Sequence, residues 1–434
     1  MAAPWGRALV PPQPFFDLAK VAKVDNDPVM VRWIFGATVS GSPSSLKALT
    51  SYLNRRAAEQ LARQVPFYVP MLEQLQVDTG RRGPILIGAV KGTRHPFILP
   101  LDVLAQHTVI YGATGVGKTV LLFLLIGQAA EHVPVWIIDR AKGDYRALAR
   151  VMPSLVVING HRDLAWNPLE VPAHLTPQQA IAVFVAVFSK SFSLMIGSQS
   201  LLQQGLHELY ERLGIFDGCA AYPTIGELRE HIASKGLRGH YRAMQYQDTV
   251  INRLDGMLLE APKTYGYRKG FPIDDLGKRS LVFELGDLNE HHARFLSTHM
   301  LSTLFHQRMR EGSRGARLQT LVVVDEAGWL APPADNVEAI GWSPLSDVLR
   351  MGREAGIGLI MASQTANLDD ALLENTRTKI SFRLGNGKDI ERIRAALGLD
   401  RDQTTYLSRM GIGECVVGIP QMRPFLITVP EMRP

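Results

Sequence analysis

The chain has 434 residues, 46% of them apolar and 20% charged, which excludes a disordered chain and predicts a globular protein with a large core and two or three domains. Its two cysteines, Cys219 and Cys415, lie far apart, which argues against a disulfide framework or a zinc site and favours a reducing, cytoplasmic environment. The net charge of +6 is carried by residues 1–100, which contain 12 Lys and Arg against 6 Asp and Glu.

Residues 1–27 are rich in proline, and we expect them to wrap over another surface rather than fold alone. They contain no uninterrupted apolar run, so neither a signal peptide nor a membrane anchor is predicted. Residues 28–100 are expected to form a small α+β region with a helix at 44–63 and strand-like runs at 29–39, 83–90 and 95–101. The basic surplus of this region fits nucleic-acid binding, a solvated surface or an interface with an acidic neighbour.

The stretch YGATGVGKT, residues 111–119, has the spacing G-x-x-x-x-G-K-[ST] of a phosphate-binding loop. A β-branched run precedes it and an apolar helix follows, as such a loop between a buried strand and a helix requires. Lys118 would reach the β- and γ-phosphates of a nucleotide, and the Thr119 hydroxyl would bind Mg²⁺. The alternative is a glycine-rich turn that caps a core helix. The residues expected to hold ATP are Gly112, Ala113, Thr114, Gly115, Val116, Gly117, Lys118, Thr119 and Val120.

From residue 107 onward, apolar strand-like runs alternate with helical periodicity, which predicts a mainly parallel α/β sheet. Residues 170–278 have helical periodicity only and are expected to form an all-helical insertion. The predicted domains are therefore residues 1–100, the first part of the core at 101–169, the insertion, and the second part of the core at 279–434. The predicted strands lie at 107–112, 133–139, 154–160, 279–285, 318–326, 356–364, 378–384, 414–419 and 424–429.

The strand in LQTLVVVDEAGWL ends in two adjacent carboxylates, Asp325 and Glu326. Asp325 would hold the Mg²⁺ shell, and Glu326 would orient and deprotonate an attacking water. A solvated strand end is the alternative interpretation.

The stretch REAGIGLIMASQT supplies two further candidates. Gln364 ends an apolar strand that should lie next to the Asp325 strand, where its amide could sense the γ-phosphate. Arg353 ends a helix and should face away from its own nucleotide, so it would serve the nucleotide of a neighbouring subunit. A helix-terminal arginine favoured by the helix dipole is the alternative, and Arg350, Arg377 and Arg383 are rival candidates.

Together these segments resemble the HerA/FtsK superfamily of P-loop motors, which includes conjugative coupling proteins and type IV secretion ATPases. The matching segments fall in family order across residues 107–418: HTVIYGATGVGKT, VWIIDRAKGDY, WNPLE, LVVVDEA, REAGIGLIMASQT and IGECVVGI. The resemblance implies a RecA-like core, a hexameric ring with ATP at subunit interfaces, and translocation of double-stranded DNA through a central pore. It also implies that Lys118 and Thr119 are the Walker A pair, Asp325 and Glu326 the Walker B pair, Gln364 the sensor, Arg353 the interface arginine and Asp139 an acidic residue near the metal.

The sequence thus predicts a cytoplasmic, hexameric ATPase that uses ATP and Mg²⁺, moves double-stranded DNA and does not insert into membranes. Two alternatives stay open. One is a secretion-type ATPase acting on protein, and the other is an ATPase subunit that regulates a partner nuclease in a defence or recombination complex.

Overall fold

The computed structural model describes residues 13–62, 65–71, 75, 84–93, 95–140, 143–236, 241–310, 317–332, 344–420 and 422–430. The first 12 residues of the expected proline-rich arm lie outside this part of the chain. None of the described helices is both long and apolar enough to cross a bilayer.

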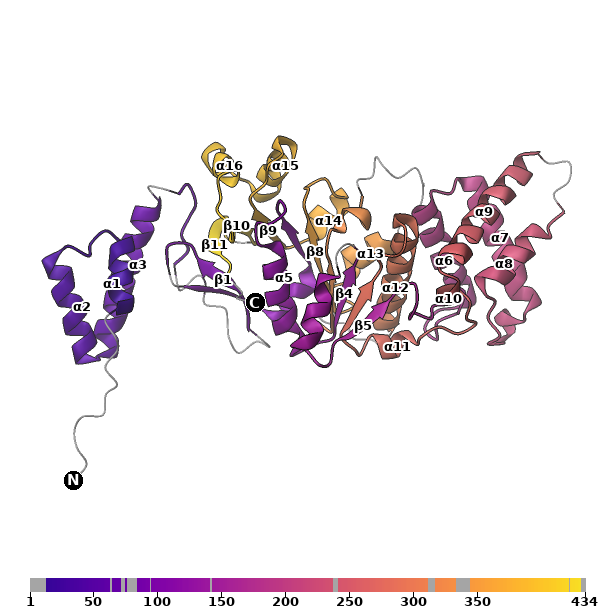
Figure 1. Cartoon of the computed structure of the whole chain (residues 1–434), viewed down its shortest axis with the longest axis horizontal. Coiled ribbons are helices and arrows are strands. Elements are labelled where there is room, and N and C mark those ends of the chain that lie inside the picture. Colours follow the sequence, from indigo (N-terminus) through magenta and orange to yellow (C-terminus); the bar gives the residue numbers. More distant parts are fainter. Residues whose placement is uncertain are drawn as a thin grey trace, which may run out of the picture.

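A single mixed sheet forms the centre of the molecule (Figure 1). Its strand order within the described residues is β2-β1-β11-β10-β9-β3-β8-β7-β4-β6-β5. The strands from β9 to β5 are parallel, whereas β10, β11, β1 and β2 extend the sheet in antiparallel fashion. Each of the nine strands expected after residue 107 is present, and the predicted mainly parallel α/β fold is confirmed. The bounds are β1 Pro84–Val90, β2 Pro96–Pro100, β3 Thr108–Tyr111, β4 Val135–Asp139, β5 Val156–Asn159, β6 Leu281–Glu284, β7 Thr320–Val324, β8 Ile357–Ser363, β9 Thr378–Phe382, β10 Glu414–Gly418 and β11 Phe425–Thr428.

Helices cover both faces of this sheet, and the two-residue period of the strands divides the core between them. Ile137 of β4 belongs to the same buried cluster as Leu122 of α5 (Lys118–Ala130). Its neighbour Ile138 belongs to the cluster that contains Leu301 of α12 (Glu290–Arg310). The parallel strands are therefore buried on both sides, which explains their unbroken apolar runs. The other helices of the core are α13 Pro344–Met351, α14 Asp370–Asn375, α15 Gly387–Leu397, α16 Arg401–Leu407, and the 3₁₀ turns η1 Leu101–Gln106, η2 Asp144–Arg150 and η4 Ala327–Trp329.

The described residues between β5 and β6 form helices joined by turns and loops, with no strand, as expected, and most of them lie at one end of the molecule (Figure 1). Thr176 and Thr224 begin two of its helices with capping boxes, which satisfy the first free N–H groups. Asn167, in the WNPLE stretch, links the start of this segment to two of its later loops by donating to the carbonyls of Pro223 and Arg268. Its elements are α6 Pro177–Phe192, α7 Ile196–Arg212, η3 Ile215–Asp217, α8 Ile225–Ala233, α9 Tyr241–Glu260, α10 Pro262–Tyr265 and α11 Ile273–Leu276.

The N-terminal helices lie at the opposite end of the molecule and have a buried cluster of their own (Figure 1). They are α1 Gln13–Val21, α2 Pro28–Ser40 and α3 Pro43–Ala62. The strand-like run expected at 29–39 is wrong, because these residues lie in α2. The Asp27 side chain accepts from the Val29 N–H, Pro28 occupies the first turn and Gly41 ends the helix in the left-handed region. These terminal signals outweigh the β-branched content of the run.

The two other predicted strands of the N-terminal region, β1 and β2, join the main sheet, where β1 pairs with β11. The predicted domain boundary at residue 100 stays a prediction.

Candidate active site

The phosphate loop connects β3 to α5 and owes its shape to glycine. Gly115 and Gly117 have φ values of +76° and +114°, in the region that L-residues rarely adopt. Gly112 is required by packing, since an added Cβ would lie 2.7 Å from Cβ of Phe382 in β9. The loop thus curls tightly before α5, whose first N–H groups and dipole favour an anion at this point.

Lys118, the first residue of α5, is buried and turns back into the loop. Its ammonium group donates to the Gly112 carbonyl at 2.5 Å and to the Ala113 carbonyl at 3.4 Å. A cavity of about 250 Å³ opens beside it. The lining residues are Ala113, Thr114, Gly115, Gly117, Lys118, Thr119, Val120, Asp325, Glu326, Gln364 and Ile412. The phosphate loop, the Asp325–Glu326 pair and Gln364 therefore line the same cavity.

The order of the strands brings these residues together, because β3, β8 and β7 are parallel neighbours whose carboxyl ends lie at the same edge of the sheet. Glu326 follows β7 with φ 56° and ψ 51°, a conformation uncommon for a non-glycine residue and typical of functional positions. Gln364, which follows β8, donates to Oε1 of Glu326 at 2.5 Å. Its own Oε1 accepts from the Thr114 hydroxyl at 2.9 Å. One amide thus connects the phosphate loop to the expected general base.

Three carboxylates follow adjacent strands at this edge: Asp325 after β7, Asp139 at the end of β4 and Glu284 at the end of β6. All three are buried. Asp139 is adjacent to Asp325 across the strands, but it does not line the cavity as far as the structure describes it. Its role as a metal ligand stays a prediction.

Two residues of η2 that the sequence reasoning missed contact these carboxylates. The Tyr145 hydroxyl donates to Oδ2 of Asp325 at 3.1 Å, and Arg146 pairs with Glu284 through both guanidinium and carboxylate branches. Burial, and then the charge of Asp325, raise the pKa of Tyr145, so its hydroxyl keeps its proton. The tyrosine stands in the quoted stretch VWIIDRAKGDY, but no local pattern indicates that its hydroxyl reaches a carboxylate 180 residues away.

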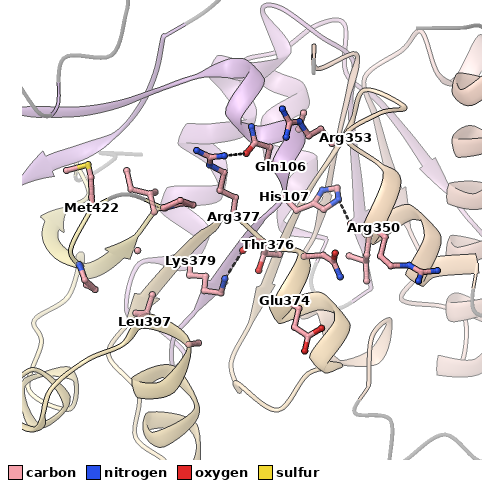
Figure 2. A pocket seen from close by; sticks show the side chains of 18 residues that line it. Gln106, His107, Arg350, Arg353, Glu374, Thr376, Arg377, Lys379, Leu397 and Met422 are labelled. Carbon is pink, nitrogen blue, oxygen red and sulfur yellow. Dashed lines mark hydrogen bonds between the residues drawn. The ribbon is translucent and has the colours of Figure 1, made fainter. Parts of the chain in front are cut away.

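Arg353 lies away from this site and lines a second cavity of about 600 Å³ (Figure 2). This cavity adjoins the residues that precede β3, β8 and β9, and so lies at the opposite, amino edge of the parallel sheet. Figure 2 shows Arg377 bonded through Nη1 to Oε1 of Gln106, at 2.6 Å, with Arg353 nearby. The expectation that Arg353 faces away from its own nucleotide therefore agrees with its position.

The rival arginines differ in their surroundings. Arg350 lines the same cavity as Arg353 but pairs with Asp347 at 2.9 Å. Arg383 instead follows β9 at the edge that carries the phosphate loop, where its carbonyl accepts from the Ala113 N–H. Arg350, Arg353 and Arg377 thus share the far edge, and Arg383 does not.

His107 lines this second cavity and connects two of the elements around it. Its Nδ1 accepts from the Leu359 N–H of β8 at 3.1 Å, so its proton resides on Nε2, which donates to the Leu349 carbonyl of α13 at 3.0 Å. Burial lowers the pKa of His107 to about 4. A neutral imidazole therefore joins the start of β3 to the helix that precedes Arg353.

The residues around the phosphate loop fit a magnesium nucleotide. A hydroxyl from Thr119 and a carboxylate from Asp325 are hard oxygen ligands, which Mg²⁺ prefers. No group of three or more His, Cys, Asp or Glu within the described ranges is placed to hold a metal ion by itself.

Comparison with known proteins agrees with this geometry. The family model for the central domain of the helicase HerA matches residues 85–304. The chain belongs to this family. Among curated relatives, the DNA double-strand break repair helicase HerA of Sulfurisphaera tokodaii is 23% identical over 350 residues, which cover 77% of this chain and 66% of that protein. The HerA helicase of Saccharolobus solfataricus is 21% identical over 361 residues, or 80% of this chain and 68% of the relative. This HerA-family chain thus matches about two thirds of the length of either relative.

Solved structures show the same fold. VirB4 of Thermoanaerobacter pseudethanolicus is 20% identical with a TM-score of 0.63, over 82% of this chain and 98% of that one. The plasmid coupling protein TrwB in complex with a non-hydrolysable ATP analogue is 14% identical with a TM-score of 0.61, over 83% and 92% of the two chains. The chain therefore has the RecA-like P-loop fold of HerA/FtsK-type ATPases, as predicted.

Proposed function

We propose that this chain is an ATP-hydrolysing motor that works as a hexameric ring and moves double-stranded DNA through a central pore. The observation that carries the proposal is the separation of the expected site residues between two edges of one sheet. The cavity with Lys118, Glu326 and Gln364 lies at the carboxyl edge, and Arg353 lies at the amino edge. A complete site then forms where the carboxyl edge of one subunit meets the amino edge of the next.

At such an interface Lys118 would bind the β- and γ-phosphates, and Thr119 and Asp325 would hold Mg²⁺, with Asp139 beside them. Mg²⁺ bound there would neutralise negative charge on the phosphate oxygens. Glu326 orients the attacking water and accepts its proton. Arg353 of the neighbouring subunit stabilises charge in the transition state.

Gln364 connects nucleotide sensing to hydrolysis. Its amide oxygen accepts from Thr114 in the phosphate loop, and its amide nitrogen donates to Glu326. A γ-phosphate that displaced either contact would change the position of the general base. This arrangement supports the sensor role of Gln364.

The choice of DNA as the translocated polymer is supported by the family and by the printed names of the curated relatives, which are DNA double-strand break repair helicases. The fold likeness to VirB4 and TrwB does not separate DNA from protein as a substrate. The cytoplasmic location and the partner proteins stay predictions.

The ATPase rate with and without double-stranded DNA tests this proposal. We expect strong stimulation by DNA of any sequence, and a logarithm of the DNA affinity that falls by about 0.9 per neutralised phosphate for each tenfold rise in salt. Indifference to DNA would contradict the DNA motor and favour a secretion-type ATPase acting on protein or a subunit that regulates a nuclease. Particle size by gel filtration and electron microscopy tests the hexamer separately.

A further inference from the structure

Tyr145 is in contact with two different parts of the phosphate-loop site. Its hydroxyl donates to Oδ2 of Asp325 at 3.1 Å. Its ring packs edge-on against Phe123 of α5, with the centroids 5.3 Å apart. Only 1% of the tyrosine is exposed, so this position is set by packing on all sides. Tyr145 therefore joins the helix that begins at Lys118 to the carboxylate that follows β7.

The Asp325 carboxylate is held at both oxygens. Oδ1 accepts from the Glu326 N–H at 3.0 Å, and Oδ2 accepts from Tyr145. Two donors on different oxygens fix the plane of the carboxylate, and with it the directions of its oxygen lone pairs.

The orientation of the Asp325 carboxylate matters because the residues beside it on the adjoining strands are acidic. Asp139 is adjacent to it, and Glu284 follows on the next strand. Arg146, the residue after Tyr145, pairs with Glu284. The short η2 segment thus brings one donor to the first carboxylate of the row and one cation to the last, which limits repulsion between buried like charges.

We propose that Tyr145 is a positioning residue that orients the Asp325 carboxylate and thereby sets the affinity of the nucleotide site for Mg²⁺. The inference rests on the proposed function, because it assumes that nucleotide and Mg²⁺ bind at the phosphate loop. Partners that orient metal-binding groups in proteins typically contribute about 10- to 100-fold to metal affinity. A similar contribution is expected from this hydroxyl.

The test uses the full chain with the variant Tyr145→Phe, which keeps the ring and removes only the donor. Binding of a fluorescent, non-hydrolysable ATP analogue is measured during a Mg²⁺ titration and again in excess EDTA. We expect the half-saturating Mg²⁺ concentration to rise at least about 10-fold, while binding in EDTA stays within about twofold of the wild type. Mn²⁺ binding, followed by electron paramagnetic resonance in the presence of the analogue, should weaken in parallel.

Tyr210→Phe is the matched control, since it also removes a buried tyrosine hydrogen bond, to the Leu169 carbonyl at 2.6 Å, but one that joins α7 of the helical insertion to the residue just before the insertion. It should lower the melting temperature about as much as Tyr145→Phe and leave the Mg²⁺ titration unchanged. A double-mutant cycle adds a second readout, because Tyr145→Phe should have no further effect on the titration in an Asp325→Asn background.

The outcomes separate the two proposals. A Mg²⁺ titration of Tyr145→Phe that matches the wild type, or a full effect that persists in the Asp325→Asn background, overturns the role of Tyr145 while the ATPase stands. Wild-type protein that fails to bind the analogue, or binds it equally after Lys118→Ala, overturns the proposed nucleotide site and this inference with it.

Discussion

The side-chain amide of Gln364 donates to the Glu326 carboxylate at 2.5 Å and accepts from Thr114 on its other side. A group expected to sense phosphate is therefore bonded to the group expected to activate water. Both residues follow adjacent parallel strands, so the contact depends on the order of β8 and β7 in the sheet.

Removing this contact should slow hydrolysis more than it weakens binding. For Gln364→Ala we expect about a 10- to 100-fold lower kcat with nearly unchanged affinity for the ATP analogue, because the phosphate loop stays intact while Glu326 loses its anchor. Steady-state kinetics and equilibrium binding measure the two effects. Gln203→Ala, on the exposed side of α7, is the control. A variant whose KM rises while kcat is unchanged would contradict the sensor role.

Substitutions of Lys118 and Glu326 should impair different steps, nucleotide binding and hydrolysis respectively. Lys118→Ala should abolish nucleotide binding, since the ammonium group at the loop is lost. Glu326→Gln should keep binding and lose about 10²- to 10⁴-fold in hydrolysis, because only the water-activating carboxylate is removed. Analogue binding and phosphate release distinguish the two. Near wild-type turnover by Glu326→Gln would show that the general base lies elsewhere.

Arg353 should act on the nucleotide of a neighbouring subunit. Arg353→Ala should bind ATP normally and hydrolyse it at least about 10³-fold more slowly, the scale associated with arginine fingers. Mixed with Lys118→Ala subunits, it should recover part of the activity, because some interfaces then pair an intact pocket with an intact arginine. Phosphate release from co-purified mixed rings measures the recovery.

Arg253→Ala, an exposed change on α9, is the matched control and should retain wild-type turnover. Absence of recovery in verified mixed rings would argue against action in trans. Wild-type hydrolysis by a dilute monomer would exclude it.

His107 should make the protein sensitive to mild acid. Its pKa is about 4 in the folded state because of burial, against 6.5 for an exposed histidine, so protons favour the unfolded chain. Its contribution is fully present above pH 6.5 and is lost as the pH falls towards 4, by about 3 kcal/mol in all. Urea unfolding between pH 7 and 4.5 measures this slope.

His107→Asn should be less stable at pH 7 and should show a shallower loss of stability between pH 6.5 and 4.5. His132→Asn, at an exposed position, is the control and should keep the wild-type slope. Burial also lowers the pKa of His299, to about 3. His299 is present in the wild type and in both variants, so its effect on the pH dependence of stability is the same in all three proteins. Equal slopes for wild type and His107→Asn would contradict the assignment.

The sequence alone predicts a segment correctly where the residues of that segment determine its conformation. The phosphate loop is one case, because Gly115 and Gly117 adopt backbone conformations that other residues resist, and their spacing to Lys118 is a local property. The strands after residue 107 are another, since a β-branched run buried on both faces needs no distant partner to be recognised. Residues 29–39 were mispredicted because their β-branched content suggested a strand, while the deciding signals were Asp27, Pro28 and Gly41 at the ends.

The contacts that give the site its chemistry were decided only by the tertiary structure. Tyr145 meets Asp325 across 180 residues, and Thr114 meets Gln364 across 250, because crossover connections place β3, β8, β7 and β4 side by side. Strand order depends on how all the helices pack on the two faces, and no short stretch of sequence encodes it. The parallel arrangement also places Arg353 at the amino edge and the phosphate loop at the carboxyl edge. Residues that precede parallel strands and residues that follow them lie at opposite edges of the sheet.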